Sequence, residues 1–217
     1  MDLTKYGVKK NSALLTTALT HSSYANEHHC DDYERLEYLG DAVLELIMSE
    51  YFYKKTLLRE GEMTKRRSCY VCEEALDEYA KNIDLKKYIR TGNGIEANST
   101  VIADVFEAII AVIYLNAGFN KAREFVMEIA KPYIDNNTIF LSDYKSYLQE
   151  VVQTGQKSVE YKVVREIGPA HDRKFEVEVI IDGMVFAHGI GRSKKAAEQD
   201  AAKNAIELSA GGIKWNY

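Results

Sequence analysis

The chain has 217 residues, enough for one or two domains, and its 46% hydrophobic residues can supply a sizeable core. With two prolines and no low-complexity tract, a disordered or collagen-like chain is excluded. No basic segment followed by an apolar stretch opens the chain, and no run reaches the roughly 18 apolar residues of a membrane span, so we expect a cytoplasmic protein with no membrane partner. Three cysteines, an odd number, do not make a disulfide framework and fit a reducing compartment.

The net charge of −5 is unevenly distributed along the chain. Residues 142–217 contain 11 Lys and Arg against 11 Asp and Glu, so the acidic excess, 22 against 17, lies in the preceding part. Either that part has a solvated acidic surface, or some of its carboxylates are neutralised by bound cations.

The first part of the chain has a helical pattern from Asn11 to about Tyr133. Apolar residues recur there at steps of three and four, as in Leu36, Leu39 and Val43. After Pro132 the polar segment 134–138 resembles a short linker. We therefore predict an all-α domain over residues 1–133, a linker over 134–141 and a second domain over 142–217.

The second domain has a different period. Asp143 is placed to cap a helix that stops at Gly155. Apolar residues then alternate with polar ones over 159–163 and 175–181, and Asp182-Gly183 is a strong signal for a two-residue hairpin. An alanine-rich helix follows from Ser193, with small side chains that allow close packing. The predicted order is α-β-β-β-α.

The segment ERLEYLGDAVLE, from Glu34 to Glu45, places Glu34, Glu37 and Asp41 on one side of a helix. Like charges at this spacing repel each other, so the arrangement does not help the helix, although a solvated acidic stripe would look the same. Gly40 inside a helix costs about 0.5–1 kcal/mol relative to alanine. This glycine indicates close approach of another backbone or of a substrate.

The segment VIADVFEAIIAVIYL, residues 101–115, is apolar around its whole circumference except at Asp104 and Glu107. Such a helix must be buried. Burying two carboxylates without partners costs several kcal/mol each, on the order expected for unpaired ions, and the segment has no Lys, Arg or His to pair with them. We expect a bound cation; the alternatives are protonation, an ion pair with a distant base, or a position at the mouth of a cleft.

Two helices that each present two carboxylates make an oxygen-only site, which suits Mg²⁺ or Mn²⁺ better than zinc. Such a site can activate water and stabilise charge on a phosphate, which favours phosphodiester hydrolysis over acyl transfer. A di-iron centre would instead want Glu-x-x-His pairs, and neither helix has the histidine.

ERLEYLGDAVLE resembles the signature of ribonuclease III, and IADVFEAIIAVIYL is similar to the second acidic motif of that family. The resemblance runs from about Thr16 to Ser209. It implies that Glu37, Asp41, Asp104 and Glu107 bind metal, with Asp41 and Glu107 catalytic. It also implies auxiliary roles near the cleft or the dimer interface for two further carboxylates, Glu34 and Glu60.

Three features depart from the family pattern. Tyr33 stands where an asparagine is common, and Ile110 and Ala111 replace a frequent glycine-containing pair. The segment Gly92 to Thr100 lacks the usual basic Gly-Arg-x-Lys character.

The resemblance implies a homodimeric, Mg²⁺-dependent endonuclease, with Mn²⁺ as a substitute and no small-molecule cofactor, that cuts double-stranded RNA. It would leave 5′-phosphate and 3′-hydroxyl ends with a short 3′ overhang, and its substrates would be rRNA precursors and structured transcripts, including mRNA. Two rival readings are a non-catalytic RNA-binding protein on the same fold and a structural helical oligomer with an RNA-binding tail.

The α-β-β-β-α order resembles the double-stranded RNA-binding domain, which reads the shape of A-form duplex over about 16 base pairs. Cations at a helix N-terminus are unfavourable unless a phosphate docks there. Three contact regions follow from the resemblance: the first helix, the turn before the second strand, and the start of the last helix. The residues predicted to bind RNA are Gln149, Glu150, Gln153, His171, Ser193, Lys194 and Lys195.

Three other motifs are interpreted as structural. Cys69-x-x-Cys72 lies in a helical stretch without a second pair for zinc. The side chains of His28, His29 and Cys30 do not converge easily on one ion. Thr20-His21-Ser22 fits a capped turn better than part of a hydrolytic triad.

Overall fold

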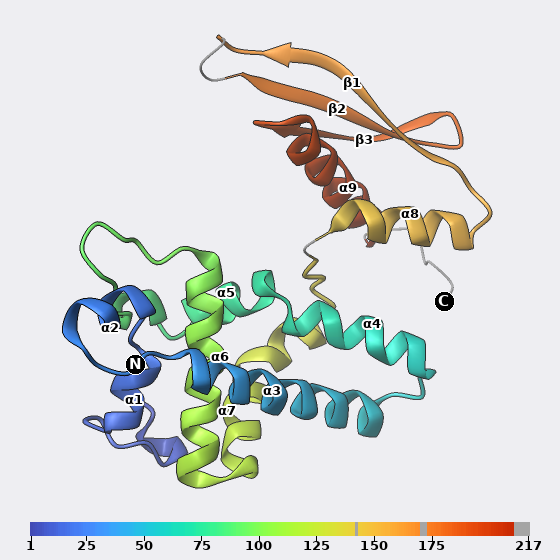
Figure 1. Ribbon diagram of the computed structural model, residues 1–217. Helices are drawn as coiled ribbons and strands as arrows, with labels where there is room; N and C mark the ends of the chain where they lie inside the picture. Colours follow the sequence, from blue (N-terminus) through green and yellow to red (C-terminus); the bar gives the residue numbers. More distant parts are fainter. Residues whose placement is uncertain (142, 170–172, 211–217) are drawn as a thin grey trace. The chain divides into compact units, whose positions relative to one another are not determined.

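The protein is represented by a computed structural model that describes residues 1–141, 143–169 and 173–210. The chain divides into two compact units, Met1–Phe140 and Leu141–Tyr217, each with its own core (Figure 1).

Unit 1, residues Met1–Phe140, is helical throughout, as predicted. Its longest helices are α3 and α6, whose axes cross near the middle of the unit (Figure 1). The elements are η1 (Thr4–Tyr6), α1 (Ala13–Ala18), α2 (Ser22–His28), α3 (Glu34–Lys55), α4 (Glu60–Val71), α5 (Glu73–Lys81), η2 (Leu85–Tyr88), α6 (Ser99–Ala117) and α7 (Phe119–Asp135).

Helix α6 is the core helix of unit 1. It contacts α1, α3, α5 and α7, and its apolar residues from Ile102 to Ile113 are buried. By length and hydropathy α6 is also able to cross a membrane, but here neighbouring helices cover it, as they cover the core helix of a soluble protein. Asn98 caps its start by accepting a hydrogen bond from the Val101 N–H at 3.0 Å.

Residues 134–141, assigned to a linker from their sequence, lie at the boundary of unit 1. Helix α7 continues through Pro132 to Asp135, and Ile134 is buried. Phe140 is buried as well, and its ring packs against the rings of Tyr70, Tyr79 and Tyr133. This segment therefore contributes two side chains to the core.

Unit 2 has the predicted α-β-β-β-α order. It consists of α8 (Tyr144–Thr154), β1 (Val159–Ile167), β2 (Lys174–Ile181), β3 (Met184–Gly191) and α9 (Lys194–Ala210). The strands form an antiparallel sheet in the order β1-β2-β3. Asp182 and Gly183, with φ of 49° and 78°, make the tight turn between β2 and β3.

Helix α9 lies unusually close to β3. A Cβ at Gly189 would come within 2.1 Å of the Ala201 nitrogen, and one at Gly191 within 2.4 Å of the Ala197 nitrogen. Glycines on the strand and alanines on the helix thus allow the two backbones to meet. This contact fixes the start of α9 relative to the sheet.

Candidate active site and nucleic-acid interface

The candidate active site lies where α3 crosses α6. At Gly40 the two backbones touch: a Cβ there would lie 1.9 Å from the carbonyl oxygen of Glu107. The prediction that Gly40 marks a close approach of another backbone is confirmed. The contact places Asp41, the next residue on α3, beside Glu107 on α6.

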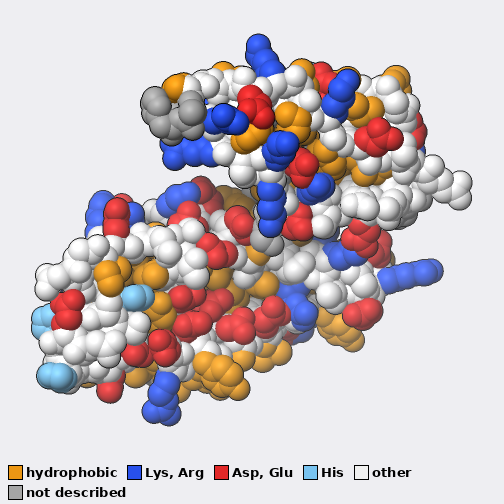
Figure 2. Space-filling view, turned by 45° about the horizontal axis from the view of Figure 1, so that its top comes forward, with side chains coloured by type: hydrophobic (Ala, Val, Ile, Leu, Met, Phe, Trp, Pro, Cys, Tyr) orange, Lys and Arg blue, Asp and Glu red, His pale blue; other side chains and the backbone are white. Residues whose placement is uncertain are grey.

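Glu37 and Asp41 on α3 and Asp104 and Glu107 on α6 are the four predicted metal ligands. Asp41 is exposed and the other three are partly buried. Figure 2 shows acidic side chains gathered over one face of unit 1. The structure therefore brings the four carboxylates of two sequence motifs, more than sixty residues apart, to one region.

Glu107 is the carboxylate most affected by this crowding. Burial, followed by the charges of Asp41, Glu37, Asp104 and Glu45, raises its pKa from 4.5 to about 8. No cation among the described residues forms an ion pair with it. Without a bound metal ion, its protonated form is therefore favoured at neutral pH, which was one of the alternatives left open by the sequence.

Glu37 and Asp104 are affected in the same direction. Burial and the charges of Asp104, Glu34 and Asp41 raise the pKa of Glu37. Burial also raises the pKa of Asp104, whereas a hydrogen bond from Tyr33 opposes this rise. The surroundings of these carboxylates thus disfavour their ionised forms, as is expected of a cation-binding site before the cation binds.

Tyr33, which precedes α3, is the one described residue that donates a side-chain hydrogen bond to any of the four predicted ligands. Its hydroxyl lies 3.0 Å from Asp104 Oδ2, and only 5% of the residue is exposed. Burial and the charges of Asp104, Glu37 and Glu34 raise the pKa of the phenol, so it remains a donor. The sequence showed Tyr33 as an unusual residue but not this contact.

The donor set fits a hard divalent cation, because it consists of carboxylate oxygens on two helices held in backbone contact. As they stand, no three His, Cys, Asp or Glu side chains in the described part of the chain converge on a single point. A bound divalent ion would offset the repulsion among the four carboxylates.

Two auxiliary carboxylates were predicted. Glu34 begins α3, is exposed, and contributes to raising the pKa of Glu37. Glu60 begins α4, and its Oε1 accepts a hydrogen bond from Thr64 at 3.1 Å. In the described part of the chain, no hydrogen bond or ion pair links Glu60 to the four predicted ligands, and its charge is not among the main ones that raise the pKa of Glu107.

Glu45 is a further carboxylate that the sequence analysis did not single out. It lies one turn beyond Asp41 on α3, and its charge reaches Glu107. Arg67 on α4 forms an ion pair with it at 2.6 Å and also donates to Ser49 at 2.9 Å. Glu45 is thereby neutralised, which sets it apart from the four predicted ligands.

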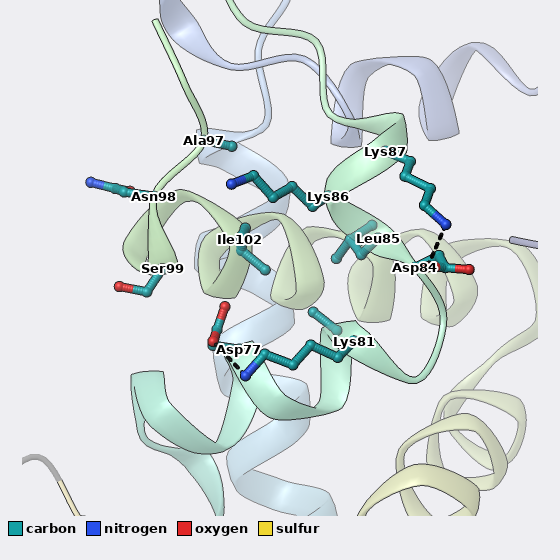
Figure 3. A pocket seen from close by; sticks show the side chains of 11 residues that line it. Asp77, Lys81, Asp84, Leu85, Lys86, Lys87, Ala97, Asn98, Ser99 and Ile102 are labelled. Carbon is teal, nitrogen blue, oxygen red and sulfur yellow. Dashed lines mark hydrogen bonds and ion pairs between the residues drawn. The ribbon is translucent and has the colours of Figure 1, made fainter.

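A hollow of about 570 Å³ opens elsewhere on unit 1, between α5, η2 and the start of α6 (Figure 3). It contains none of the predicted site residues. Each lysine that lines it has a carboxylate partner: Lys81 with Asp77, Lys86 with Glu96 and Lys87 with Asp84. Its charges are paired, in contrast to those of the carboxylate cluster.

The segment Gly92 to Thr100, which lacks basic residues, is tied to α2. Asn93 donates to both oxygens of Glu27 through its backbone and side-chain nitrogens, and the Gly92 N–H donates to Ser23 Oγ. Its only described charged side chain is Glu96, so this part of unit 1 offers no cation to a phosphate backbone.

The predicted RNA contacts of unit 2 that the structure describes lie on two elements. Gln149, Glu150 and Gln153 are exposed on α8. Lys194 and Lys195 are exposed in the first turn of α9. These lysines sit at the positive end of a helix, where an anion is favoured.

Ser193 also has the predicted place: its hydroxyl accepts a hydrogen bond from the Ala196 N–H at 3.1 Å, which caps α9. His171 lies outside the described residues.

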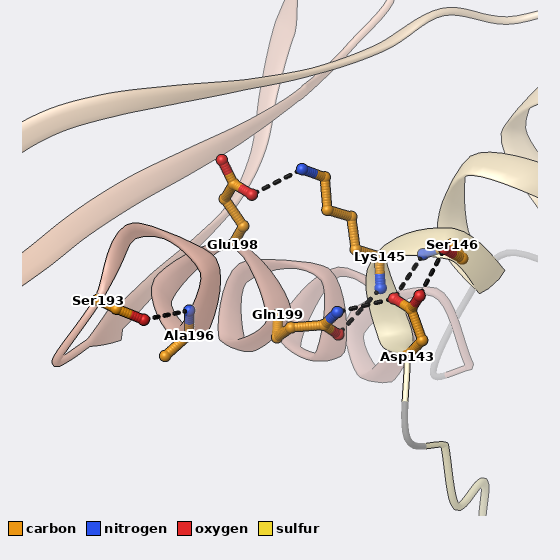
Figure 4. A network of polar contacts seen from close by, with 7 residues as sticks. All are labelled: Asp143, Lys145, Ser146, Ser193, Ala196, Glu198 and Gln199. Atoms are coloured by element: carbon orange, nitrogen blue, oxygen red, sulfur yellow. Dashed lines mark hydrogen bonds and ion pairs between the residues drawn. The ribbon is translucent and has the colours of Figure 1, made fainter.

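A polar network joins α8 and α9, the two described helices that carry predicted RNA contacts (Figure 4). Asp143 caps α8 by accepting from Ser146 N at 3.0 Å, as predicted, and also accepts from Gln199 Nε2 at 2.7 Å. Lys145 donates its backbone N–H to Gln199 Oε1 and its ammonium group to Glu198 at 2.6 Å. The start of α8 is thus fixed to α9, and with it the spacing of the two predicted contact regions.

Several side chains of the motifs interpreted as structural are partly buried, cap a helix or stack on a neighbouring ring. Burial raises the pKa of the Cys69 thiol to about 11 and that of Cys72 to about 12, so neither is a thiolate at neutral pH. His21 Nδ1 accepts the Ser23 N–H at 3.2 Å and caps α2, and His28 stacks on Tyr24.

Comparison with known families agrees with both units. The family model described as Ribonuclease-III-like matches residues 11–133, and the model of the double-stranded RNA binding motif matches residues 144–208. These matches, with the carboxylate cluster and the α-β-β-β-α unit, define an endoribonuclease that acts on double-stranded RNA and has its own RNA-binding domain. The chain belongs to the ribonuclease III family.

Individual relatives support this assignment. The chain is 43% identical over 205 residues to Ribonuclease 3 of Streptococcus pneumoniae strain P1031, covering 89% of this chain and 88% of that protein. Ribonuclease 3 of strain Hungary19A-6 has the same identity and coverage. Among solved structures, a nuclease domain of ribonuclease III from Campylobacter jejuni is 32% identical, with a TM-score of 0.53, over 60% of this chain and 97% of that one.

Proposed function

We propose that this enzyme hydrolyses phosphodiester bonds of double-stranded RNA with Mg²⁺ held by Glu37, Asp41, Asp104 and Glu107, and that Mn²⁺ can replace Mg²⁺. The observation that carries this proposal is the crowding of four carboxylates, with no cationic side chain among the described residues to pair them, at the contact of α3 with α6. Of these, Asp41 and Glu107 are the pair that the Gly40 contact brings together, and we assign them the catalytic role.

The bound ion supplies an activated water and stabilises charge on the phosphate. Glu107 would give up its proton on binding the ion, since its raised pKa reflects burial and the neighbouring carboxylates. The Gly40 contact holds α3 and α6 together, so Asp41 and Glu107 would both be able to hold the ion.

The reaction leaves a 5′-phosphate and a 3′-hydroxyl. The water oxygen bonds to phosphorus as the water gives up a proton, the bond from phosphorus to the 3′ oxygen breaks, and that oxygen takes up a proton. The products of the two strands would carry a short 3′ overhang if two sites act across the duplex.

Unit 2 would hold the duplex. Gln149, Glu150 and Gln153 would contact 2′-hydroxyls in a minor groove, and Lys194 and Lys195 would dock on phosphates at the start of α9. We include His171 in the contact set by resemblance. Because recognition follows A-form shape, rRNA precursors and structured mRNA transcripts in the cytoplasm are the substrates we propose.

A homodimer would supply the two sites. Helix α3 exposes an apolar stripe next to Asp41: Tyr38, Leu46 and Tyr53 are 83%, 57% and 74% exposed and lie seven or eight residues apart, on one side of the helix. Such a stripe favours a second protein surface. The Campylobacter jejuni nuclease domain has a region involved in dimer formation.

The test uses long duplex RNA, Mg²⁺ and three proteins: wild type, Glu107→Gln, and Glu124→Gln. The control removes an exposed carboxylate on α7 whose partner is Lys121. We expect wild type and the control to cut, and Glu107→Gln to bind RNA without cutting. EDTA should stop cleavage, and the 5′ ends should accept ligation without prior phosphorylation. Cleavage by Glu107→Gln would refute the assigned mechanism, and RNA binding by a wild type that never cuts would favour a non-catalytic RNA-binding protein.

A further inference from the structure

The hydrogen bond from Tyr33 to Asp104 joins two positions 71 residues apart, at the edge of the carboxylate cluster. The phenol oxygen lies 3.0 Å from Asp104 Oδ2. A second contact of the same chemistry exists in the chain, because the Tyr6 hydroxyl donates to Glu128 Oε2 at 2.8 Å, on the η1 and α7 side of unit 1. Only the Tyr33 contact involves a predicted metal ligand.

Tyr33 is held from several directions. Its backbone N–H donates to the Thr20 carbonyl at 3.0 Å, and its own carbonyl accepts from the N–H groups of Leu36 and Glu37 at 2.8 and 2.9 Å. Its ring packs against His21 with centroids 5.8 Å apart. The phenol is therefore a fixed donor: its backbone is bonded on both sides and its ring is buried.

The other predicted ligands have no such support. In the described part of the chain, no protein donor gives a hydrogen bond to Glu37, Asp41 or Glu107, and the main charges that act on Glu37 and Glu107 are negative. Asp104 differs, because one of its oxygens, Oδ2, accepts the hydrogen bond from Tyr33. The cluster thus combines one carboxylate that a protein donor orients with three that have no such donor among the described residues.

We propose that Tyr33 is a positioning residue for metal binding: it fixes the Asp104 carboxylate so that the ion finds one ligand already in place. The proposal rests on the proposed metal site and adds a residue to it. Residues that orient metal ligands by hydrogen bonds typically change metal affinity 10- to 100-fold when they are lost, about what we expect here.

The experiment measures Mn²⁺ and Mg²⁺ binding to the full chain by calorimetry, for wild type, Tyr33→Phe and the matched control Tyr6→Phe. Both substitutions remove only a hydroxyl that donates to a carboxylate. We expect Tyr33→Phe to weaken metal binding about 10- to 100-fold. Tyr6→Phe should bind metal within twofold of wild type, and both variants should bind duplex RNA in EDTA as wild type does.

Cleavage gives a second readout. For Tyr33→Phe the Mg²⁺ concentration that gives half the maximal rate should rise, and excess Mg²⁺ should restore the rate, which a loss of folding would not allow. In a background of Asp104→Ala, which removes the acceptor, the additional change of Tyr33 to Phe should have no further effect on metal affinity. This cycle assigns the effect to the one contact.

Several outcomes overturn the proposal. Metal affinity of Tyr33→Phe within twofold of wild type would do so, and so would an equal loss in Tyr6→Phe. An effect of Tyr33→Phe that is just as large in the Asp104→Ala background would also do so. If Tyr33→Phe does not fold, the loss of structure in EDTA shows that the hydroxyl serves the fold, and the proposal fails. A wild type that binds no metal would refute the proposed metal site itself, a result distinct from the others.

Discussion

Replacing Glu107 by glutamine should make the metal-free protein more stable in alkaline solution. In the folded chain the pKa of Glu107 is about 8, against 4.5 for an ordinary glutamate, because burial and neighbouring carboxylates disfavour its charge. The folded state therefore keeps a proton between these two pH values that the unfolded chain has lost. Stability falls as pH rises through this window, and the loss is complete above about pH 8.

The size of the effect follows from the pKa. At about 1.4 kcal/mol for each tenfold change in proton affinity, the ionised side chain costs at most about 5 kcal/mol. Relaxation of the side chain toward water reduces this, so we expect about 2–4 kcal/mol, the range for a poorly compensated buried charge. Glutamine has nearly the same shape and no charge, so it removes the repulsion and keeps the packing.

The assay is urea unfolding in EDTA at about pH 5 and about pH 9. The variant should match wild type at the lower pH and exceed it at the higher one, while Glu124→Gln should differ little at either. Saturating Mn²⁺ should narrow the difference, because wild type gains about 2.7 kcal/mol at a concentration 100 times its Kd and the variant gains less. A variant that is less stable than wild type at pH 9 in EDTA would refute the reasoning.

Three more outcomes are expected. Gly40→Ala should cost about 1–3 kcal/mol of stability by urea unfolding and weaken metal binding, because its Cβ meets the Glu107 carbonyl; an unchanged midpoint would contradict the close contact. Replacing Lys194 and Lys195 together by alanine should weaken duplex binding and reduce the slope of log affinity against log salt by about 2 in fluorescence anisotropy, whereas an unchanged slope would show that no phosphate docks there. Asp143→Ala should lower the free energy of unfolding by about 1 kcal/mol near pH 7. The pKa of Asp143 is lowered to about 2, mainly by hydrogen bonds from Ser146, so the stability difference between wild type and variant should vanish only as pH falls through that value. A stability difference that persists at about pH 1.5 would contradict this.

Local signals in the sequence predicted most of unit 2. Asp143 and Gly155 bound α8, and Asp182 with Gly183 makes the turn between two strands, because caps and tight turns depend on residues a few positions apart. Helix α6 was equally predictable, since a segment that is apolar on all sides has no solvent-facing position.

Long-range packing was less predictable. The polar residues 135–137 suggested a linker, yet Phe140 follows them and returns to the core against Tyr70, Tyr79 and Tyr133. The Tyr33 hydrogen bond has the same origin, because it depends on how the start of α3 is placed over α6. Neither contact leaves a periodic pattern in the sequence.

The acidic excess of the first domain lowers the stability of the fold where carboxylates have no basic partner. Several acids of unit 1, such as Glu45 with Arg67, have a basic partner that offsets their charge. Glu37 and Glu107 face only other carboxylates, and their raised pKa values show that the fold is less stable for it. Two neighbouring carboxylates do not stabilise a helical core. The close packing of α3 on α6 at Gly40 nevertheless brings their charges together. Local conflict of this kind is expected at functional sites, where a ligand supplies the missing charge.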